Sequence, residues 1–325
     1  MADGTVTGGT VYLVGAGPGA PDLLTLRAAR LLAAADIVFH DALVHADTIA
    51  LATRAEKIAV GKRHGAHSTA QTFINKRLID AARKHRIVVR LKGGDPMLFG
   101  RAQEEIDALT AAGIAYEVVP GITAALAASA QLGVSLTRRG RSRSVTFATP
   151  RVGHDERPSG WMQAVQDADT AALYMAAHEA QAIATALMAG GKPGTTPVAI
   201  VENASLPAMT HQVTTLKALS TNGFGPPSGP ALLLIGEVYR EVLAAARAQV
   251  RRRPDAAEHA AHPAHPAHPE HPAHPEHPEH PAHPEHPEHP EHPEHPEHPA
   301  HPEHPEHPAR PEHPAHATRQ FIMAR

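Results

Sequence analysis

The chain of 325 residues contains no cysteine, few aromatic residues (3%) and no long apolar run. The absence of cysteine excludes a disulfide framework, thiolate metal sites, iron–sulfur clusters and a cysteine nucleophile. No apolar run approaches the ~20 residues that a membrane-spanning helix needs. Residues 1–9 have no basic segment followed by an apolar one, so we expect no secretory signal. These absences suit a cytoplasmic protein.

Charge is unevenly distributed along the chain. Residues 1–254 carry 27 Lys and Arg against 20 Asp and Glu, a net charge of +7, whereas residues 255–325 carry 3 against 13, a net charge of −10. The segment from His259 to His316 holds 19 of the 27 histidines and 18 of the 31 prolines. A basic body is therefore followed by an acidic, histidine-rich tail.

The tail repeats the dipeptide His-Pro sixteen times at a three-residue period, with Ala or Glu in the third place, from His262 to Pro308. Such dense proline removes backbone donors, and no large apolar side chain offsets the entropy of ordering, so we expect disorder with a polyproline II bias. In that conformation successive histidines lie roughly 9 Å apart along one edge. Two interpretations stay open, a passive solvated extension and weak binding of divalent ions such as nickel, cobalt, copper or zinc.

Strands and helices alternate through the body, which predicts an α/β fold. In the first half we expect the sheet to be largely parallel. The pattern predicts strands over 11–14, 37–39, 87–91 and 116–119, and helices over 23–35, 71–84 and 101–112. An alanine-rich helix follows Thr123 and ends at residue 132. In the second half, whose sheet we expect to be mixed, it predicts strands over 144–149, 171–175, 197–201 and 231–235, and helices over 179–189 and 239–252.

We expect four parts, because a body of this length usually forms two domains. They are a flexible N-terminus over 1–9, an N-terminal α/β domain with the ligand loops over 10–120, a C-terminal α/β domain over 121–253, and a disordered tail over 254–325. No metal site is expected in the body.

The first glycine-rich loop, Gly15-Ala-Gly-Pro-Gly19, follows a strand and precedes a helix. Its glycines and Ala20 satisfy the dinucleotide fingerprint, with Asp41 about where a ribose-binding acid is expected. The same pattern suits a methyltransferase that binds S-adenosylmethionine, or a purely structural turn. Pro18 removes one amide donor and so disfavours pyrophosphate binding.

Two more loops are predicted at the same edge of the sheet, because each follows a strand of the same direction. They are Lys92-Gly-Gly-Asp-Pro96 and Pro120-Gly-Ile-Thr-Ala124. Gly-Gly-Asp-Pro is also a good turn in its own right. Ligands of open α/β sheets bind at the carboxyl edge, so three loops together predict a ligand site there.

Six motifs in order resemble the tetrapyrrole methylases. They are Val11-Tyr-Leu-Val-Gly-Ala-Gly-Pro-Gly19, His40-Asp-Ala-Leu-Val44, Val60-Gly-Lys-Arg63, Arg90-Leu-Lys-Gly-Gly-Asp-Pro96, Val118-Val-Pro-Gly-Ile-Thr123, and Pro230-Ala-Leu232 before Ile235-Gly-Glu237. Within this family, Gly-Lys-Arg followed by His67 and Gln71 most resembles the uroporphyrinogen-III C-methyltransferases. The resemblance covers roughly residues 8–245, and we expect the single-function form because no further domain precedes Val11.

The resemblance implies two α/β domains with the active site in the cleft between them, and a homodimer. It also implies transfer of methyl groups from S-adenosyl-L-methionine to C2 and C7 of uroporphyrinogen III, giving precorrin-2 for sirohaem or cobalamin biosynthesis, with no nucleic-acid or membrane partner. An octacarboxylate substrate suits the basic body and the clusters Lys62-Arg63, Arg90 with Lys92, and Arg138-Arg139 with Arg141.

Site residues are implied by the same resemblance. It places the following in or beside the cofactor loops: Pro18, Gly93, Gly94, Asp95, Leu98, Thr123, Ala124, Met175, Ala204, Ala231 and Leu232. It implies that Asp41 accepts and Lys62 donates a proton during catalysis. From the residues alone, Asp41 could equally be a helix cap or a substrate-orienting acid, and Lys62 could hold a carboxylate.

The chain also departs from the family's pattern, which leaves room for a changed substrate. The departures are Ala20, Ala102-Gln103, Ala176, Ala204 and Arg138-Arg139. Three alternatives therefore stay open. They are a later precorrin or cobalt-precorrin methylase, an NAD-dependent oxidoreductase with a Rossmann loop at residues 15–20, and a metal store that uses the tail.

Overall fold

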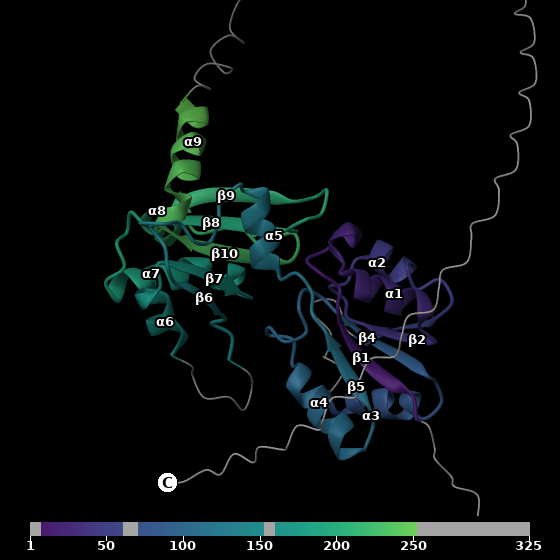
Figure 1. The fold of residues 1–325 in the computed structure, drawn as a ribbon. Helices are drawn as coiled ribbons and strands as arrows, with labels where there is room; N and C mark the ends of the chain where they lie inside the picture. The colour runs from purple at the N-terminus through teal and green to yellow at the C-terminus, as the bar shows by residue number, and fades with distance from the viewer. Residues whose placement is uncertain (1–7, 61–70, 153–159, 252–325) are drawn as a thin grey trace, which may run out of the picture. The chain divides into compact units, whose positions relative to one another are not determined.

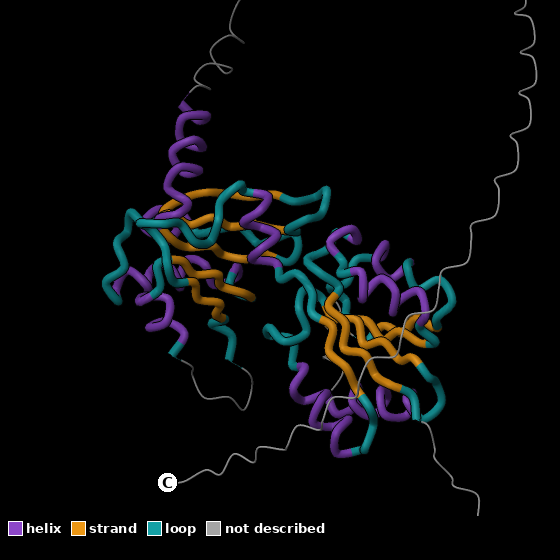
Figure 2. Tube along the Cα trace, in the orientation of Figure 1, coloured by secondary structure: helices purple, strands orange, loops and turns teal. Residues whose placement is uncertain are grey.

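The computed structural model describes residues 8–60, 71–152 and 160–251, all within a contiguous unit that spans residues 1–262 (Figure 1). Each half of this unit contains a β-sheet flanked by helices, as the strands and helices of Figure 2 show. Within the described ranges, no helix is both long enough and apolar enough to cross a membrane. The predicted α/β class is confirmed.

The first sheet contains five parallel strands in the order β3-β2-β4-β1-β5. They are β1 (Thr10–Gly15), β2 (Ile37–His40), β3 (Glu56–Ala59), β4 (Ile87–Lys92) and β5 (Tyr116–Val119). Branched apolar side chains fill the central strands, as expected for a parallel sheet covered on both faces. The prediction of a parallel sheet is confirmed, but β3 was not predicted, because this edge strand begins with the exposed polar residues Glu56 and Lys57.

Helices cover both faces of the first sheet. Ala28 and Leu32 of α1 (Leu26–Ala34) pack in one apolar cluster, next to the short helix α2 (Ala46–Ala50). Ile74 and Leu78 of α3 (Gln71–Ala82) pack with Leu109 of α4 (Ala102–Ala111) in a second cluster. The two clusters share no residue, so the sheet separates them into a three-layer α/β/α arrangement.

Helix α1 begins three residues later than the apolar pattern predicted. Pro21–Leu23 form a separate 3-10 turn, η1, and Leu24 is extended. Thr25 is the N-cap of α1, and its hydroxyl accepts a hydrogen bond from the Ala28 amide at 3.1 Å. Capping by threonine satisfies a free amide of the first turn, which fixes the start of the helix at this point. The glycine loop therefore does not run directly into a helix.

The second sheet is mixed, as predicted, with the order β6-β7-β10-β8-β9. Its strands are β6 (Val145–Ala148), β7 (Thr170–Tyr174), β8 (Pro197–Glu202), β9 (Thr210–Thr215) and β10 (Ala231–Gly236). Only β6 and β7 pair in parallel, and the other pairs are antiparallel. Strand β9 was not predicted, because it lies at the sheet edge and its first residues are polar and exposed.

Helices also cover both faces of the second sheet. On one face pack α6 (Trp161–Asp167), η2 (Ala177–Glu179), α7 (Ala180–Ala189) and α8 (Leu216–Asn222). On the other face pack α5 (Ala124–Gln131) and η3 (Glu237–Tyr239), which continues into α9 (Arg240–Arg251). Tyr239 is fully buried, and its hydroxyl lies 3.2 Å from that of Ser129 in α5. This pair joins the two segments that cover the second face.

Candidate functional site

Four loops follow neighbouring strands at the carboxyl edge of the first sheet. Along the order β2-β4-β1-β5, these strands are followed by Asp41, the loop 93–101, the loop 16–20 and the loop 120–123. Because all four strands are parallel, their carboxyl ends lie at one edge. The predicted juxtaposition of the three glycine-bearing loops is therefore confirmed.

Backbone contacts hold these three loops together. Gly17 and Gly94 exchange two hydrogen bonds, Gly94 N to Gly17 O at 2.7 Å and Gly17 N to Gly94 O at 3.2 Å. A side chain at Gly121 would place its Cβ 2.3 Å from the Gly94 oxygen, so only glycine fits there. Gly94 itself has a φ of 68°, a conformation that glycine adopts without strain. The three loops form a continuous surface made of backbone.

Asp95 ties the second loop to the third with both oxygens of its carboxylate. Oδ1 accepts a hydrogen bond from Met97 N at 2.8 Å, and Oδ2 accepts one from Gly121 N at 2.9 Å. Hydrogen bonds from backbone amides to a carboxylate are among the stronger ones in proteins. Asp95 therefore orders the loops around it. Leu98 belongs to the same turn, because its amide donates a hydrogen bond to the Asp95 carbonyl at 3.3 Å.

Hydrogen bonds join this edge to the second half of the chain. Thr123 Oγ1 lies 2.6 Å from the hydroxyl of Tyr174, which also accepts a hydrogen bond from Ala125 N at 3.1 Å. In the first loop, Ala20 N donates to Ser205 Oγ at 2.9 Å. Burial raises the pKa of Tyr174, so its hydroxyl stays protonated at neutral pH. Tyr174 and Ser205 were not predicted, although each is adjacent to a predicted site residue, Met175 and Ala204 respectively, because their contacts are with loops distant in the sequence.

The site residues predicted in the second half gather at one edge of the second sheet. Met175 follows β7 and is exposed, Ala204 follows β8 and is buried, and Ala231 begins β10, which runs antiparallel to both. Leu232 is also buried, and its side chain packs in the cluster of the second face. Any contact of Leu232 with a ligand would therefore involve its backbone.

Strained backbone is concentrated at these same loops. Among the described residues, five other than glycine have positive φ angles between 51° and 71°: Phe99, Arg101, Met175, Asn203 and Ser205. Each of these conformations costs on the order of 1–3 kcal/mol. Strain of this kind is found preferentially at ligand sites, where the surrounding structure holds it in place. The five positions come from both halves and follow β4, β7 and β8.

A buried ionic cluster lies beneath Asp41. Glu105 of α4 is fully buried, and it accepts hydrogen bonds from Arg90 Nε and Lys92 Nζ, each at 2.9 Å, and from Gln71 Nε2 at 3.1 Å. Arg90 Nη2 in turn donates to Asp41 Oδ1 at 2.5 Å. Burial and the nearby charge of Arg90 lower the pKa of Lys92. Burial also acts to lower the pKa of Arg90, but the carboxylates of Asp41 and Glu105 outweigh it and raise that pKa.

This cluster corrects the expectation that Arg90 and Lys92 attract a carboxylate substrate. Their exposed fractions are only 3% and 2%, and both already contact Glu105. Glu105 itself was missed, because a glutamate in the first turn of a helix is usually a solvated residue. Among the described residues, no group of three or more His, Asp or Glu is arranged to hold a metal ion.

Asp41 remains accessible at the edge of the sheet. Its side chain is 28% exposed, and within the described residues Oδ2 accepts no hydrogen bond. It is no helix cap, since the next helix begins at Ala46 with His45 as its N-cap. Lys62 and Arg63 lie outside the described residues. Strand β3, which precedes them, ends beside β2, where Val60 N donates to the His40 carbonyl at 2.9 Å.

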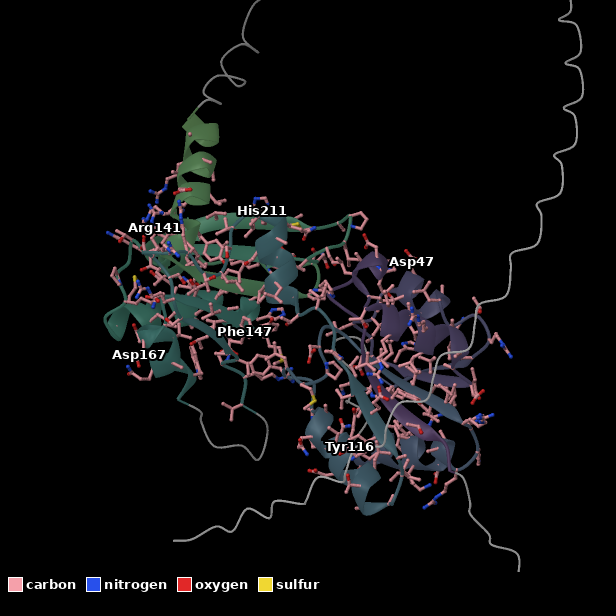
Figure 3. The ribbon with its side chains drawn as sticks, in the orientation of Figure 1. Asp47, Tyr116, Arg141, Phe147, Asp167 and His211 are labelled. Atoms are coloured by element: carbon pink, nitrogen blue, oxygen red, sulfur yellow. The ribbon has the colours of Figure 1, made fainter. Side chains whose placement is uncertain are left out.

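The arginines at 138–141 are far from the loops. Arg138 and Arg141 both contact Glu241 at the start of α9, at 2.8 and 3.3 Å. They precede β6, whereas the loops of the site lie near the carboxyl ends of β6 and β7, at the opposite edge of the sheet. Figure 3 labels Arg141 and Phe147, which lie before and within β6. Arg138 and Arg141 thus form ion pairs at the opposite edge of the second sheet from the loops, which counts against the expectation that they face the substrate.

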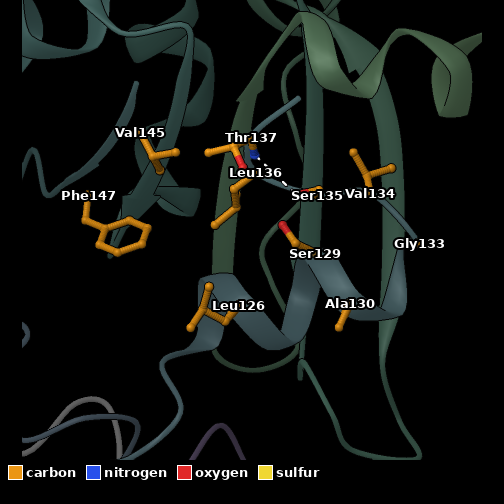
Figure 4. A pocket seen from close by; sticks show the side chains of 10 residues that line it. All are labelled: Leu126, Ser129, Ala130, Gly133, Val134, Ser135, Leu136, Thr137, Val145 and Phe147. Atoms are coloured by element: carbon orange, nitrogen blue, oxygen red, sulfur yellow. Dashed lines mark hydrogen bonds between the residues drawn. The ribbon is translucent and has the colours of Figure 1, made fainter. Parts of the chain in front are cut away.

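Two cavities flank Phe147 of β6. One of about 520 Å³ lies between α5, residues 133–137 and β6, with Leu126, Leu136 and Val145 among its lining residues (Figure 4). The other, of about 400 Å³, is lined by Phe99, Thr146–Thr149, Arg151, Val152, Gly160, Trp161 and Ala164. The second includes a residue of the loop that follows β4, so it adjoins the candidate site.

The arrangement as a whole defines a class of protein. Two α/β halves carry glycine-bearing loops, a carboxylate and strained residues at adjoining sheet edges, which is typical of an enzyme that binds a small organic cofactor. A model of the family described as tetrapyrrole (corrin/porphyrin) methylases matches residues 10–220. The chain belongs to this family.

Similar proteins agree with this assignment. A sirohaem synthase from Psychrobacter sp. (strain PRwf-1) is 47% identical over 234 residues, which cover 71% of this chain and 48% of that protein. The chain thus spans about half the length of the curated relatives it matches. A crystal structure of uroporphyrin-III C-methyl transferase from Thermus thermophilus, complexed with S-adenyl homocysteine, is 39% identical with a TM-score of 0.63, covering 71% of this chain and 99% of the other. A cobalt precorrin-4 methyltransferase is 29% identical with a TM-score of 0.62, covering 73% and 98%.

Proposed function

We propose that this chain transfers methyl groups from S-adenosyl-L-methionine to C2 and C7 of uroporphyrinogen III, giving precorrin-2. The observation that carries the proposal is the match to the Thermus uroporphyrin-III C-methyl transferase, which covers 99% of that chain at 39% identity. The cobalt precorrin-4 methyltransferase, in contrast, is 29% identical. This difference favours uroporphyrinogen III over a later corrin intermediate as the substrate.

The loops fit S-adenosylmethionine better than they fit a dinucleotide. A pyrophosphate needs free backbone amides at a helix N-terminus. In the first loop the Ala16, Gly17 and Ala20 amides already donate to Lys92 O, Gly94 O and Ser205 Oγ, and Pro18 has none. The helix begins only after η1. The loop geometry therefore disfavours NAD as a cofactor.

A surface made largely of loop backbone suits the neutral nucleoside and the amino-acid part of S-adenosylmethionine. When bound, S-adenosylmethionine supplies an electrophilic methyl group on a sulfonium. We propose that it is held by the following residues of the two edges: Pro18, Gly93, Gly94, Asp95, Leu98, Thr123, Ala124, Met175, Ala204, Ala231 and Leu232. In this assignment Asp95 acts through the loops that it orders.

The protein's main task in such a reaction is alignment, because the pyrrole carbons are themselves nucleophilic. Positive charge that develops on the ring must be stabilised and a proton removed. We propose Asp41 as the proton acceptor, since its Oδ1 is fixed by Arg90 and Oδ2 accepts no hydrogen bond within the described residues. Lys62, which lies outside them, is proposed as the proton donor.

Titration of the full chain tests the cofactor. S-adenosylhomocysteine should bind in isothermal calorimetry with a stoichiometry of one, and NAD should not. Methyl-labelled S-adenosylmethionine with uroporphyrinogen III should then give precorrin-2. Binding of NAD in place of S-adenosylhomocysteine would overturn the whole proposal, and labelling of only a later corrin intermediate would reassign the substrate.

We further propose that the chain forms a homodimer and that its two domains divide at residues 120–121. The connection Pro120–Thr123 supports this boundary, since it leads from the last strand of the first sheet to a helix on the second. Light scattering of the purified chain measures the oligomeric state. A monomer at micromolar concentration would contradict the dimer.

For the tail we propose weak, multivalent binding of nickel or cobalt, supported by the sixteen His-Pro repeats. Calorimetry of the full chain and of a variant that lacks residues 255–325 should show metal binding only in the former. Equal binding by both would make the tail a passive extension.

A further inference from the structure

The cavity of about 400 Å³ beside β6 has the composition of a site for an aromatic acid. Phe99, Phe147 and Trp161 line it, together with the guanidinium-bearing Arg151. Ligand cavities are lined mainly by apolar and aromatic side chains with a few polar groups that fix orientation. The volume suits one five-membered ring with its acidic side chains, and it is too small for a whole tetrapyrrole.

An aromatic row connects this cavity to the glycine-bearing loops. The Phe99 ring lies 5.2 Å from the Tyr174 ring, and the Phe147 ring lies 6.3 Å from it in an edge-to-face arrangement. The Tyr174 hydroxyl lies 2.6 Å from Thr123 Oγ1 in the third loop. A ring in the cavity would therefore lie next to the loop that follows β4, to which Phe99 belongs.

The exposure of two of these rings points to a ligand. Phe99 and Phe147 are 40% and 37% exposed, although their partner Tyr174 is half-buried. Leaving large apolar side chains exposed in one patch is unfavourable and typical of a binding surface. Phe99 also has a φ of 54°, a strained conformation for an aromatic residue. The backbone therefore presents this ring at the cavity at the expense of local stability.

We propose that this cavity binds one carboxylate-bearing pyrrole ring of the substrate, with Phe99 and Phe147 against the ring and Arg151 on its carboxylate. The proposal rests on the proposed function, and it adds which part of the second half contacts the substrate. It also supplies a cation for the substrate, since Arg90, Lys92, Arg138 and Arg141 already pair with glutamates of the chain. Arginine suits this role because its planar donors match a carboxylate.

The variants Phe147→Ala and Arg151→Gln in the full chain test this proposal. Both residues are exposed, so neither truncation removes a core side chain. We expect the KM for uroporphyrinogen III to rise about tenfold or more in each, because loss of a desolvated contact to a ligand weakens binding by at least this order. The dissociation constant of S-adenosylhomocysteine should change less than twofold. Arg151→Lys should recover only part of the loss.

Matched controls are Tyr116→Ala and Arg86→Gln. Tyr116 is an exposed aromatic residue at the start of β5, and Arg86 is an exposed arginine before β4, at the opposite edge of the first sheet from the loops. Both should leave the KM unchanged. A KM unchanged in Phe147→Ala and Arg151→Gln would overturn the cavity assignment while the proposed function stands.

Failure of the proposed function has a different signature. If the wild-type chain binds fluorescent uroporphyrin III but does not methylate the porphyrinogen, the proposed function is wrong, and the affinities of the two variants for the porphyrin still decide the cavity assignment. If the wild-type chain neither methylates nor binds, both proposals are overturned.

Discussion

The two halves of the body bury different kinds of polar group. Among the described residues, all three buried charged side chains, Arg90, Lys92 and Glu105, belong to the first half. The first half also buries the hydroxyl of Thr48, whereas the second half buries hydroxyl groups and, among the described residues, no charged side chain. The hydroxyls of the second half include those of Ser129, Ser142, Thr170, Thr196, Thr215 and Tyr239. Both sheets are covered by helices on both faces, so the layered arrangement alone does not account for this difference.

Buried charges are expensive unless each is paired, and they rarely add stability over apolar residues. Their position therefore matters more than their number. Arg90 reaches from Glu105 to Asp41, so the cluster fixes the carboxylate that we propose as proton acceptor. The hydroxyls of the second half hold segments in place, as Ser142 Oγ does with Thr170 Oγ1 at 2.8 Å. The first half thus places its buried charges next to Asp41, whereas the buried hydroxyls of the second half join its own segments.

The largest expected effect comes from breaking the buried cluster. Glu105→Ala leaves Arg90 and Lys92 buried without their shared carboxylate, and removing one partner of a buried ion pair costs about 3–5 kcal/mol. Urea denaturation should show a loss of this size in the free energy of unfolding. The control is Glu104→Ala, whose exposed carboxylate contacts Arg101 and should contribute less than about 1 kcal/mol. Equal effects of the two substitutions would mean that the buried pairs of Glu105 contribute no more than an exposed ion pair.

A backbone substitution tests the loops above the cluster. In Gly121→Ala the new Cβ would clash with the Gly94 oxygen, so the second and third loops must separate. We expect S-adenosylhomocysteine affinity to fall at least tenfold in calorimetry and the unfolding free energy to fall by about 1–3 kcal/mol. Gly225→Ala is the matched control, because a Cβ there meets nothing within 4 Å and its φ is not positive. Unchanged affinity in Gly121→Ala would mean that the cofactor does not bind on this surface.

The second half gives a pH-dependent prediction. Burial raises the pKa of Tyr239 to about 12 from 10.0, against the smaller opposing effect of its hydrogen bond with Ser129. Between these values the unfolded chain releases the tyrosine proton while the folded chain keeps it, so stability falls as the pH rises. Wild type should lose about 1 kcal/mol relative to Tyr239→Phe between pH 10 and pH 11.

The control for this pH effect is Tyr116→Phe, because Tyr116 is exposed. Its unfolding free energy should parallel that of wild type over the same pH range. At neutral pH, Tyr239→Phe should be less stable than wild type by about 1 kcal/mol, since Ser129 loses its partner. The difference between Tyr239→Phe and wild type should therefore shrink on going to high pH. A constant difference would refute the burial effect.

Residue patterns predicted the central strands and the loops well, because buried strands and glycine-rich turns leave local signals. They failed for β3 and β9, since edge strands need no apolar run. They also failed for the start of α1, where the Thr25 cap outweighed the apolar spacing. For the two edge strands, the missing information was which face of each residue meets solvent, and only the assembled sheet determines this.

Charge was the least predictable property of the site. Arg90 and Lys92 looked like a basic surface, yet they pair with Glu105, which lies on the next helix of the first half. Residue type tells the sign of a charge but not its burial or its partner. The same limit explains why Tyr174 and Ser205 were missed, since their roles arise from contacts with loops far away in the sequence.

The smallest expected effect tests the other arginines. Arg141→Ala removes an exposed contact of 3.3 Å with Glu241, which keeps its shorter ion pair with Arg138, so the unfolding free energy should change by no more than about 0.5 kcal/mol. Because Arg141 precedes β6 and the site lies near the opposite end of that strand, the KM for uroporphyrinogen III should equal that of wild type. A raised KM in steady-state assays would return these arginines to the substrate site. It would also give the second half another cationic contact with the acidic substrate, beside the one proposed for Arg151.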